Sequence, residues 1–187
     1  MIEQIKEFDT NLFLWLNSIH SPAMDSFFFA ITNRFVWIPV YLILLFLLIK
    51  KKKNKTWSIL LFIVILIICS DQLSVLIKEN VMRYRPCHNL NIQGVVHTVN
   101  NKCGGKYGFV SSHATNTMAL FAFLVLSVFK KERIVIALLA IYVLLVSYSR
   151  VYLGVHYPFD ILGGWITGLA VALVLYYFVY NKLFNQP

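Results

Sequence analysis

The sequence is dominated by long apolar runs that are separated by short polar connections. The runs that can form apolar helices lie at residues 35–49, 57–77, 114–129, 134–148 and 159–180. An α-helix rises 1.5 Å per residue, so about 20 apolar residues cross the hydrocarbon core of a bilayer, and the shorter runs must tilt or extend into their flanks. The pattern predicts an all-α integral membrane bundle with five to six spans.

Residues 12–32 follow a less regular pattern. They are apolar and aromatic, but they are interrupted by Asn17, His20, Ser21, Pro22 and Asp25. We therefore predict that residues 1–34 form interfacial helices rather than a sixth clean span. We also expect residues 1–187 to form a single domain, which is usual for a chain of this length.

Composition narrows the class of protein further. Apolar residues make up 59% of the chain and charged residues 13%, whereas a soluble globular domain carries about 25% charged residues. This balance excludes a disordered chain, a coiled coil and an ordinary cytosolic enzyme. The class that remains is an integral membrane protein whose surroundings are the bilayer.

The positive charge of the chain is concentrated between apolar runs. The formal net charge is +9, and residues 50–55 read KKKKNK. Because this cluster adjoins an apolar run, we interpret it as a topology signal and expect no nucleic-acid partner. Lys130, Lys131 and Arg133 follow the third run in the same way. With both basic loops on the cytoplasmic side, residues 78–111 form a long outward-facing loop, and residues 149–158 face the same side.

Several charged residues fall at the outward ends of the runs. Lys78, Arg85 and Arg150 would repel one another at one depth unless an anion lay between them, and arginine forks match phosphate oxygens. Ser112 is placed like the N-cap of the third helix, and Pro158 like the first-turn proline of the fifth. Free amides at such helix starts also bind anions. Taken singly, each cation is better explained by snorkelling to the interface, but all three beside two histidines indicate a phosphate site.

Two histidines complete a set of groups for phosphoryl transfer. His156 and Asp160 are one helical turn apart, so the carboxylate can accept the Nδ1 proton and leave Nε2 as a nucleophile. His113, across the site, can donate a proton to a leaving oxygen. For His20, His88 and His97 we expect structural roles.

The same residues form motifs. The chain reads KENVMRYRP at residues 78–86, VSSH at 110–113 and SRVYLGVHYPFD at 149–160. It thereby resembles the type 2 phosphatidic acid phosphatase (PAP2) family, whose blocks are Lys-x6-Arg-Pro, Pro-Ser-Gly-His and Ser-Arg-x5-His-x3-Asp. The first and third blocks match in full. In the middle block Val110 replaces the proline and Ser112 the glycine. Vanadium haloperoxidases share the blocks and the helical core, but they are soluble and larger.

The resemblance implies a role for each matched residue. His156 would attack phosphorus and form a phosphohistidine, with Asp160 orienting it. His113 would protonate the leaving group and then activate water. The phosphate oxygens would be held by Lys78, Arg85, Ser111 and Arg150, with backbone amides near Ser112. The family needs no metal, and the sequence offers no ligand set for one, so we expect no cofactor.

The resemblance also implies a function. We expect a membrane lipid phosphatase of the bacterial inner (cytoplasmic) membrane, with its active site facing the periplasm. The candidate substrates are undecaprenyl diphosphate, lipid A phosphate, phosphatidylglycerophosphate and phosphatidate. The alternatives are a lipid-to-lipid phosphotransferase that uses the same site and a non-catalytic lipid-binding or transport protein. We expect a monomer whose partners are the lipid phosphate and the bilayer.

Four further features of the sequence carry expectations. Cys87 and Cys103 share the outward loop, where a disulfide is favoured over free thiols and over a zinc site with nearby histidines. Cys69 lies within a run and is expected to be buried. Asp71 lies two turns before Lys78 on the same face and is expected to support Lys78 or a neighbouring polar group. The glycines at 163, 164 and 168 indicate close helix packing within the monomer, with dimerisation as the alternative.

Overall fold

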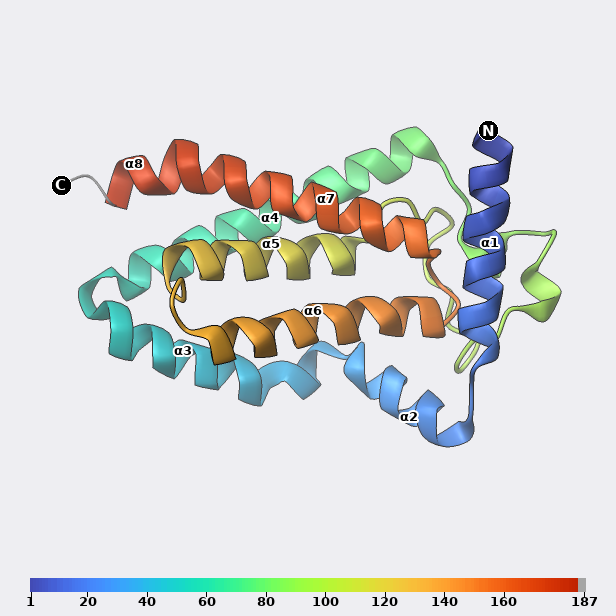
Figure 1. Cartoon of the computed structure of the whole chain (residues 1–187), viewed down its shortest axis with the longest axis horizontal. Helices are drawn as coiled ribbons and strands as arrows, with labels where there is room; N and C mark the ends of the chain where they lie inside the picture. Colours follow the sequence, from blue (N-terminus) through green and yellow to red (C-terminus); the bar gives the residue numbers. More distant parts are fainter. Residues whose placement is uncertain (185–187) are drawn as a thin grey trace.

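The computed structural model describes residues 1–184, which fold into helices with no β-strand among them (Figure 1). The α-helices are α1 (Ile2–Ser18), α2 (Pro22–Ile31), α3 (Ile38–Lys52), α4 (Thr56–Val81), α5 (Ser112–Ser127), α6 (Arg133–Tyr152), α7 (Pro158–Leu175) and α8 (Asn181–Phe184). Short turns of 3-10 helix occur at η1 (Arg34–Trp37), η2 (Lys53–Lys55), η3 (Pro86–His88) and η4 (Gln93–Val95), and a π-helical turn, η5 (Tyr176–Tyr180), joins α7 to α8.

Three stretches are long and apolar enough to cross a membrane: Arg34–Val81, Arg133–Tyr152 and Pro158–Leu183. The first contains both α3 and α4, which run in opposite directions from the turn that joins them and diverge from it in Figure 1. All five apolar runs of the sequence are helical, as predicted. α5 has 16 residues and is not one of the three stretches. It packs against α4, α6 and α7.

The core of the bundle forms around α5. Phe123 of α5 is fully buried, stacks on Phe62 of α4 at 4.9 Å between ring centroids, and meets the edge of Tyr180 at 5.2 Å. Apolar side chains cover much of the outer surface, as expected for a chain surrounded by lipid. Cys69 belongs to this outer surface: it is exposed, so the expectation of a buried thiol was wrong. The apolar run predicted the helix, but not which of its faces meets the other helices.

Two glycines bring α5 and α7 into backbone contact. A Cβ atom at Gly168 would lie 2.2 Å from the carbonyl oxygen of Thr115, and one at Gly164 would lie 2.8 Å from that of Ser111. Only glycine permits this approach. The prediction of close packing within the monomer is confirmed, and the contact sets the start of α5 beside the start of α7.

The N-terminal helices differ from the bundle helices. α1 lies crosswise at one end of the bundle, and the ten-residue α2 leads back toward it (Figure 1). α1 buries Asp9, Phe13 and Asn17 while Phe8 and Trp15 on its other side are exposed. Their location at the membrane interface stays a prediction.

The loop between α4 and α5 covers the same end of the bundle as α1. Cys87 and Cys103 form a disulfide across it, with 6.0 Å between the Cα atoms, as expected. His88 adjoins both sulfur atoms, but its Nε2 contacts the carbonyl of Gly104 at 3.2 Å. The Asn17 amide donates to the carbonyl oxygens of His97 (3.1 Å) and Tyr152 (2.8 Å). The loop is therefore fastened both to itself and to the helices beneath it.

We predict that Gly168→Val destabilises the protein. The added side chain collides with the backbone of α5, and overpacking of this kind costs about 1–3 kcal/mol. For a chain of this length that corresponds to a fall of roughly 2–12 °C in the unfolding midpoint. The measurement is thermal unfolding in detergent, and Ala170→Val, at an exposed position of α7, is the matched control. Equal midpoints for the two variants would contradict the prediction.

Candidate active site

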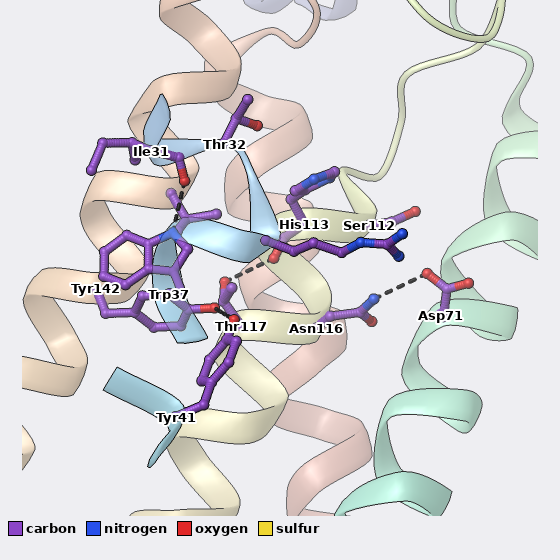
Figure 2. A pocket seen from close by; sticks show the side chains of 12 residues that line it. Ile31, Thr32, Trp37, Tyr41, Asp71, Ser112, His113, Asn116, Thr117 and Tyr142 are labelled. Carbon is purple, nitrogen blue, oxygen red and sulfur yellow. Dashed lines mark hydrogen bonds between the residues drawn. The ribbon is translucent and has the colours of Figure 1, made fainter. Parts of the chain in front are cut away.

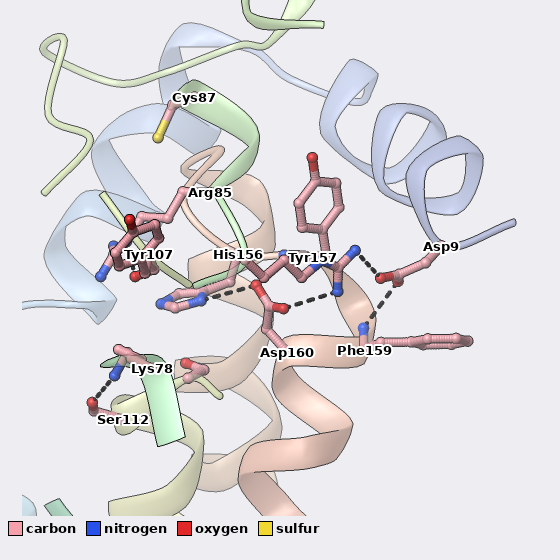
Figure 3. A network of polar contacts seen from close by, with 12 residues as sticks. Asp9, Lys78, Arg85, Cys87, Tyr107, Ser112, His156, Tyr157, Phe159 and Asp160 are labelled. Carbon is pink, nitrogen blue, oxygen red and sulfur yellow. Dashed lines mark hydrogen bonds and ion pairs between the residues drawn. The ribbon is translucent and has the colours of Figure 1, made fainter. Parts of the chain in front are cut away.

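The polar residues singled out in the sequence gather at the end of the bundle beneath α1 and the long loop. The starts of α5 and α7 meet there with the C-terminal ends of α4 and α6 (Figures 1 and 3). The backbone N–H of Ser111 donates to the carbonyl oxygen of Asp160 at 3.0 Å, which links the two helix starts directly.

As predicted, Pro158 is in the first turn of α7; the structure adds that Tyr157 is the N-cap. Asp160 Oδ2 accepts the backbone N–H of Tyr157 at 3.0 Å and lies 3.3 Å from Nδ1 of His156 (Figure 3). The carboxylate thus completes the helix cap and holds the imidazole at the same time. With Nδ1–H donated to Asp160, Nε2 of His156 carries the lone pair.

Burial and charge keep His156 neutral. The side chain is 2% exposed. Burial, followed by the positive charges of Arg85 and Arg150, holds the pKa of His156 well below its usual value. A neutral imidazole with a free lone pair is what nucleophilic attack requires.

The three predicted cations approach this pair from different elements. Lys78 of α4 donates to the Ser112 hydroxyl (Figure 3). Arg85 donates to the carbonyl oxygens of Tyr107 and Cys103, both at 3.1 Å. Arg150 of α6 donates to the Thr32 hydroxyl. Within residues 1–184 no ion pair joins any of the three to a carboxylate, so their combined charge can neutralise a bound anion.

Two buried polar atoms at this end have no hydrogen-bond partner in the described part of the chain: the Ser111 hydroxyl oxygen and Nε of Arg150. Buried polar atoms are normally paired, so orphaned donors beside clustered cations indicate a ligand with several acceptor oxygens. Phosphate fits this description.

The prediction that Ser112 is the N-cap of α5 was wrong. The cap is Ser111, and Ser112 is already the first helical residue. The Ser112 hydroxyl turns toward α4, where it lies 2.6 Å from the Ser74 hydroxyl. Because the Ser111 side chain makes no capping bond either, the amides at the start of α5 keep their capacity to bind an anion.

His113 lies on the first turn of α5 and opens into a cavity of about 230 Å³ (Figure 2). Asp71 lines the same cavity, where its Oδ1 accepts the Asn116 amide at 3.0 Å. The Ser70 hydroxyl in turn donates to Oδ1 of Asn116 at 2.7 Å. Of the two partners expected for Asp71, the structure therefore provides a neighbouring polar group as the hydrogen-bond partner.

The structure adds a salt-bridge chain that the sequence analysis missed. Arg83 donates to Oδ1 of Asp160 at 3.0 Å and to Oδ2 of Asp9 at 2.6 Å. Its guanidinium lies 4.0 Å from the centre of the Tyr157 ring. Asp9 is fully buried and also accepts the Phe159 N–H at 3.0 Å. Through Arg83, α1 is connected to the carboxylate that holds His156.

The sequence contained a signal for this chain of salt bridges. Asp9, Phe13 and Asn17 are spaced by four residues, so two polar side chains share the buried stripe of α1. A buried carboxylate needs a partner. Arg83, only two residues before Arg85, had no role assigned to it.

A family model, sequence relatives and a solved structure all relate this chain to PAP2-type phosphatases. The model of the PAP2 superfamily matches residues 55–184. The chain is 37% identical over 186 residues to the lipid A 4'-phosphatase of Bacteroides thetaiotaomicron, covering 98% of this chain and 81% of the relative. It is also 37% identical over 182 residues to the lipid A 4'-phosphatase of Porphyromonas gingivalis, covering 96% and 75%.

A solved structure shares the fold. It is the transmembrane PAP2-type phosphatidylglycerolphosphate phosphatase from Bacillus subtilis, which superimposes with a TM-score of 0.74 at 23% identity. The match covers 98% of this chain and 90% of that one. α1, α2 and the loop over the site are thus part of the shared fold and not additions to it.

We predict that Arg83→Gln destabilises the protein by about 2–3 kcal/mol, because it leaves the buried carboxylates of Asp9 and Asp160 without their cation. The unfolding midpoint in detergent should fall by roughly 4–12 °C. The double variant Asp9→Asn/Arg83→Gln buries one charge fewer and should recover part of the loss. A double variant no more stable than Arg83→Gln would contradict the coupling.

Proposed function

The chain belongs to the PAP2 superfamily, and from that premise we propose that it hydrolyses a phosphate ester or anhydride of a membrane lipid through a phosphohistidine. The observation that carries the proposal is the buried, neutral His156, held by Asp160 and faced by cations that lack a carboxylate partner in the described chain. The family and the two relatives support the reaction class.

The proposed reaction has two steps. In the first, Nε2 of His156 attacks phosphorus, the bond to the leaving oxygen breaks, and His113 gives that oxygen a proton. Asp160 stabilises the positive imidazole ring that results. In the second step His113 takes a proton from water, whose oxygen attacks phosphorus, and the P–N bond breaks to release phosphate and neutral His156.

Stabilisation of the phosphoryl group falls to the surrounding donors. Lys78, Arg85 and Arg150 neutralise the charge on the transferred group, and the Ser111 hydroxyl and free amides of α5 donate to its oxygens. All of these chemical roles belong to side chains and backbone of this chain, so we propose a reaction that needs no metal.

The two relatives named as lipid A 4'-phosphatases make a lipid A phosphate the first substrate to test. Undecaprenyl diphosphate, phosphatidylglycerophosphate and phosphatidate remain candidates. We further propose that residues 1–187 act as a single monomeric domain.

We propose that the protein lies in the bacterial inner membrane with this site facing the periplasm. The basic turn after α3 and the connection between α5 and α6 meet at the opposite end of the bundle, where Lys51 pairs with Glu132. Basic loops favour the cytoplasmic side, which sends the site outward. The disulfide in the loop over the site fits an oxidising compartment.

We predict that purified protein releases phosphate from a lipid phosphate in the presence of EDTA and that His156→Ala lowers kcat by about 1,000-fold or more, because the nucleophile is lost. The measurement is phosphate release from the four candidate lipids in detergent. His20→Ala, at an exposed position between α1 and α2, is the matched control and should retain activity. Dephosphorylation of the substrate lipid that requires a second lipid, with the phosphoryl group recovered on that acceptor and not as free phosphate, would instead establish the phosphotransferase.

We predict that protonation of His156 sets the acidic limb of the pH dependence. Because its pKa lies below the usual value, kcat/KM should stay high below pH 6.5 until His156 is protonated. Arg85→Gln removes one of the charges that lower this pKa, so the acidic limb should move to higher pH. Comparing the two proteins on one substrate cancels the ionisation of the substrate itself. Lys106→Gln, on the outer loop, should leave the limb in place.

A further inference from the structure

The cavity beside His113 is distinct from the surroundings of His156. It lies between η1, α4, α5 and α6, and His113 and Ser112 belong to its lining whereas His156 does not (Figure 2). In the proposed reaction His113 gives its proton to the leaving oxygen. The part of the substrate that departs must therefore lie on the His113 side, which is where this cavity opens.

The floor of the cavity is polar and ordered. Asp71 accepts the Asn116 amide, and Asn116 accepts the Ser70 hydroxyl, so the orientation of the carboxylate and of the amide is set before a ligand arrives (Figure 2). A carboxylate has more acceptor sites than this one bond uses, and the amide has a second N–H. Paired acceptors and donors of this kind recognise hydroxyl groups.

The opposite wall is aromatic. The Trp37 indole N–H donates to the carbonyl oxygen of Ile31 at 2.8 Å, which fixes the ring. The hydroxyl groups of Tyr41 and Tyr142 lie 3.0 Å apart, and Trp37 meets Tyr142 edge to face at 4.5 Å. Flat apolar faces opposite a hydrogen-bonding floor suit a ring that carries hydroxyl groups at its edge and C–H groups on its faces.

Charge distinguishes this cavity from the phosphate site. Apart from the catalytic His113, its charged lining consists of Arg34 and Asp71, which are of opposite sign, whereas the phosphate site gathers several cations. A second phosphate would meet the carboxylate of Asp71. The cavity therefore suits a neutral polar group, and at about 230 Å³ it is smaller than typical pockets for drug-sized ligands.

We infer that this cavity binds the sugar ring of a glycolipid phosphate, with Asp71 and Asn116 bonding a ring hydroxyl next to the phosphate that is removed. This inference rests on the proposed function and extends it to the leaving group. It assigns Asp71 and Asn116 to substrate selection.

The test is a cycle of two proteins and two substrates. The substrates are a glycolipid whose hexose ring carries a phosphate monoester, called the hexose phosphate below, and its analogue that lacks the ring hydroxyl next to that phosphate. For the native protein we expect the deoxy analogue to lower kcat/KM by about 10- to 100-fold. For Asp71→Asn we expect kcat/KM for the hexose phosphate to fall by a similar factor. The kcat/KM values for the two substrates should then become nearly equal.

One control variant and one further test variant separate an effect on substrate selection from an effect on folding. Gln72→Ala, at the adjacent exposed position of α4, should keep the full preference for the hydroxylated substrate. Asn116→Ala, a second variant of the floor, should lose the preference as Asp71→Asn does. The unfolding midpoint of each variant is measured in the same detergent.

The outcomes distinguish the two proposals. If Asp71→Asn keeps the preference, or if it lowers kcat/KM equally for both substrates, the cavity does not bind the hydroxyl and the inference is overturned. A native protein that hydrolyses phosphatidate faster than the hexose phosphate also overturns it. If the native protein releases phosphate from no lipid, with or without an acceptor lipid, the proposed function itself fails.

Discussion

The whole arrangement depends on the backbone contact between α5 and α7. Gly164 and Gly168 let α7 lie against the carbonyl oxygens of Ser111 and Thr115. The N–H of Ser111 then reaches the carbonyl of Asp160, so the uncapped start of α5, with amides that can bind an anion, lies beside the capped start of α7. His113 and His156, which are far apart in the sequence, are brought to the same end of the bundle by this contact. Larger side chains at these glycines would separate the two halves of the site.

Electrostatics then decides what the site holds. Asp160 is buried and would be costly as an isolated carboxylate. Arg83 forms an ion pair with Asp160 and a second one with Asp9. This arrangement uses one cation for two carboxylates and leaves Lys78, Arg85 and Arg150 free of ion pairs within the described residues. The excess of positive charge beside a neutral His156 is stable when an anion is bound. The same charges that attract phosphate also keep the nucleophile unprotonated.

Features formed by residues close together in the sequence were predictable, whereas most contacts between residues far apart in the sequence were not. The His156–Asp160 pair follows from one turn of spacing, and the convergence of the three cations follows from basic loops that set the direction of every span. The N-cap of α5 was wrongly assigned to Ser112 because either of two adjacent serines can cap a helix; in the structure the cap is Ser111. The spacing in α1 marks Asp9 as a buried carboxylate, but its partner Arg83 lies 74 positions away and could not be identified from local pattern. Cys69 was misjudged because an apolar run does not reveal its lipid-facing side.

The two histidines also divide the site into unlike halves. On the His156 side lie the cations, the orphaned donors and the carboxylate that orients the nucleophile, all of which serve a phosphoryl group common to any phosphate ester. On the His113 side lies a cavity with balanced charge, an ordered polar floor and an aromatic wall, none of which the chemistry of phosphorus requires. The motifs that carry the family resemblance supply the two histidines and the groups that hold the phosphoryl group. Asp71, Asn116 and the aromatic residues near η1 lie outside those motifs, so the choice of substrate can change while the reaction stays the same.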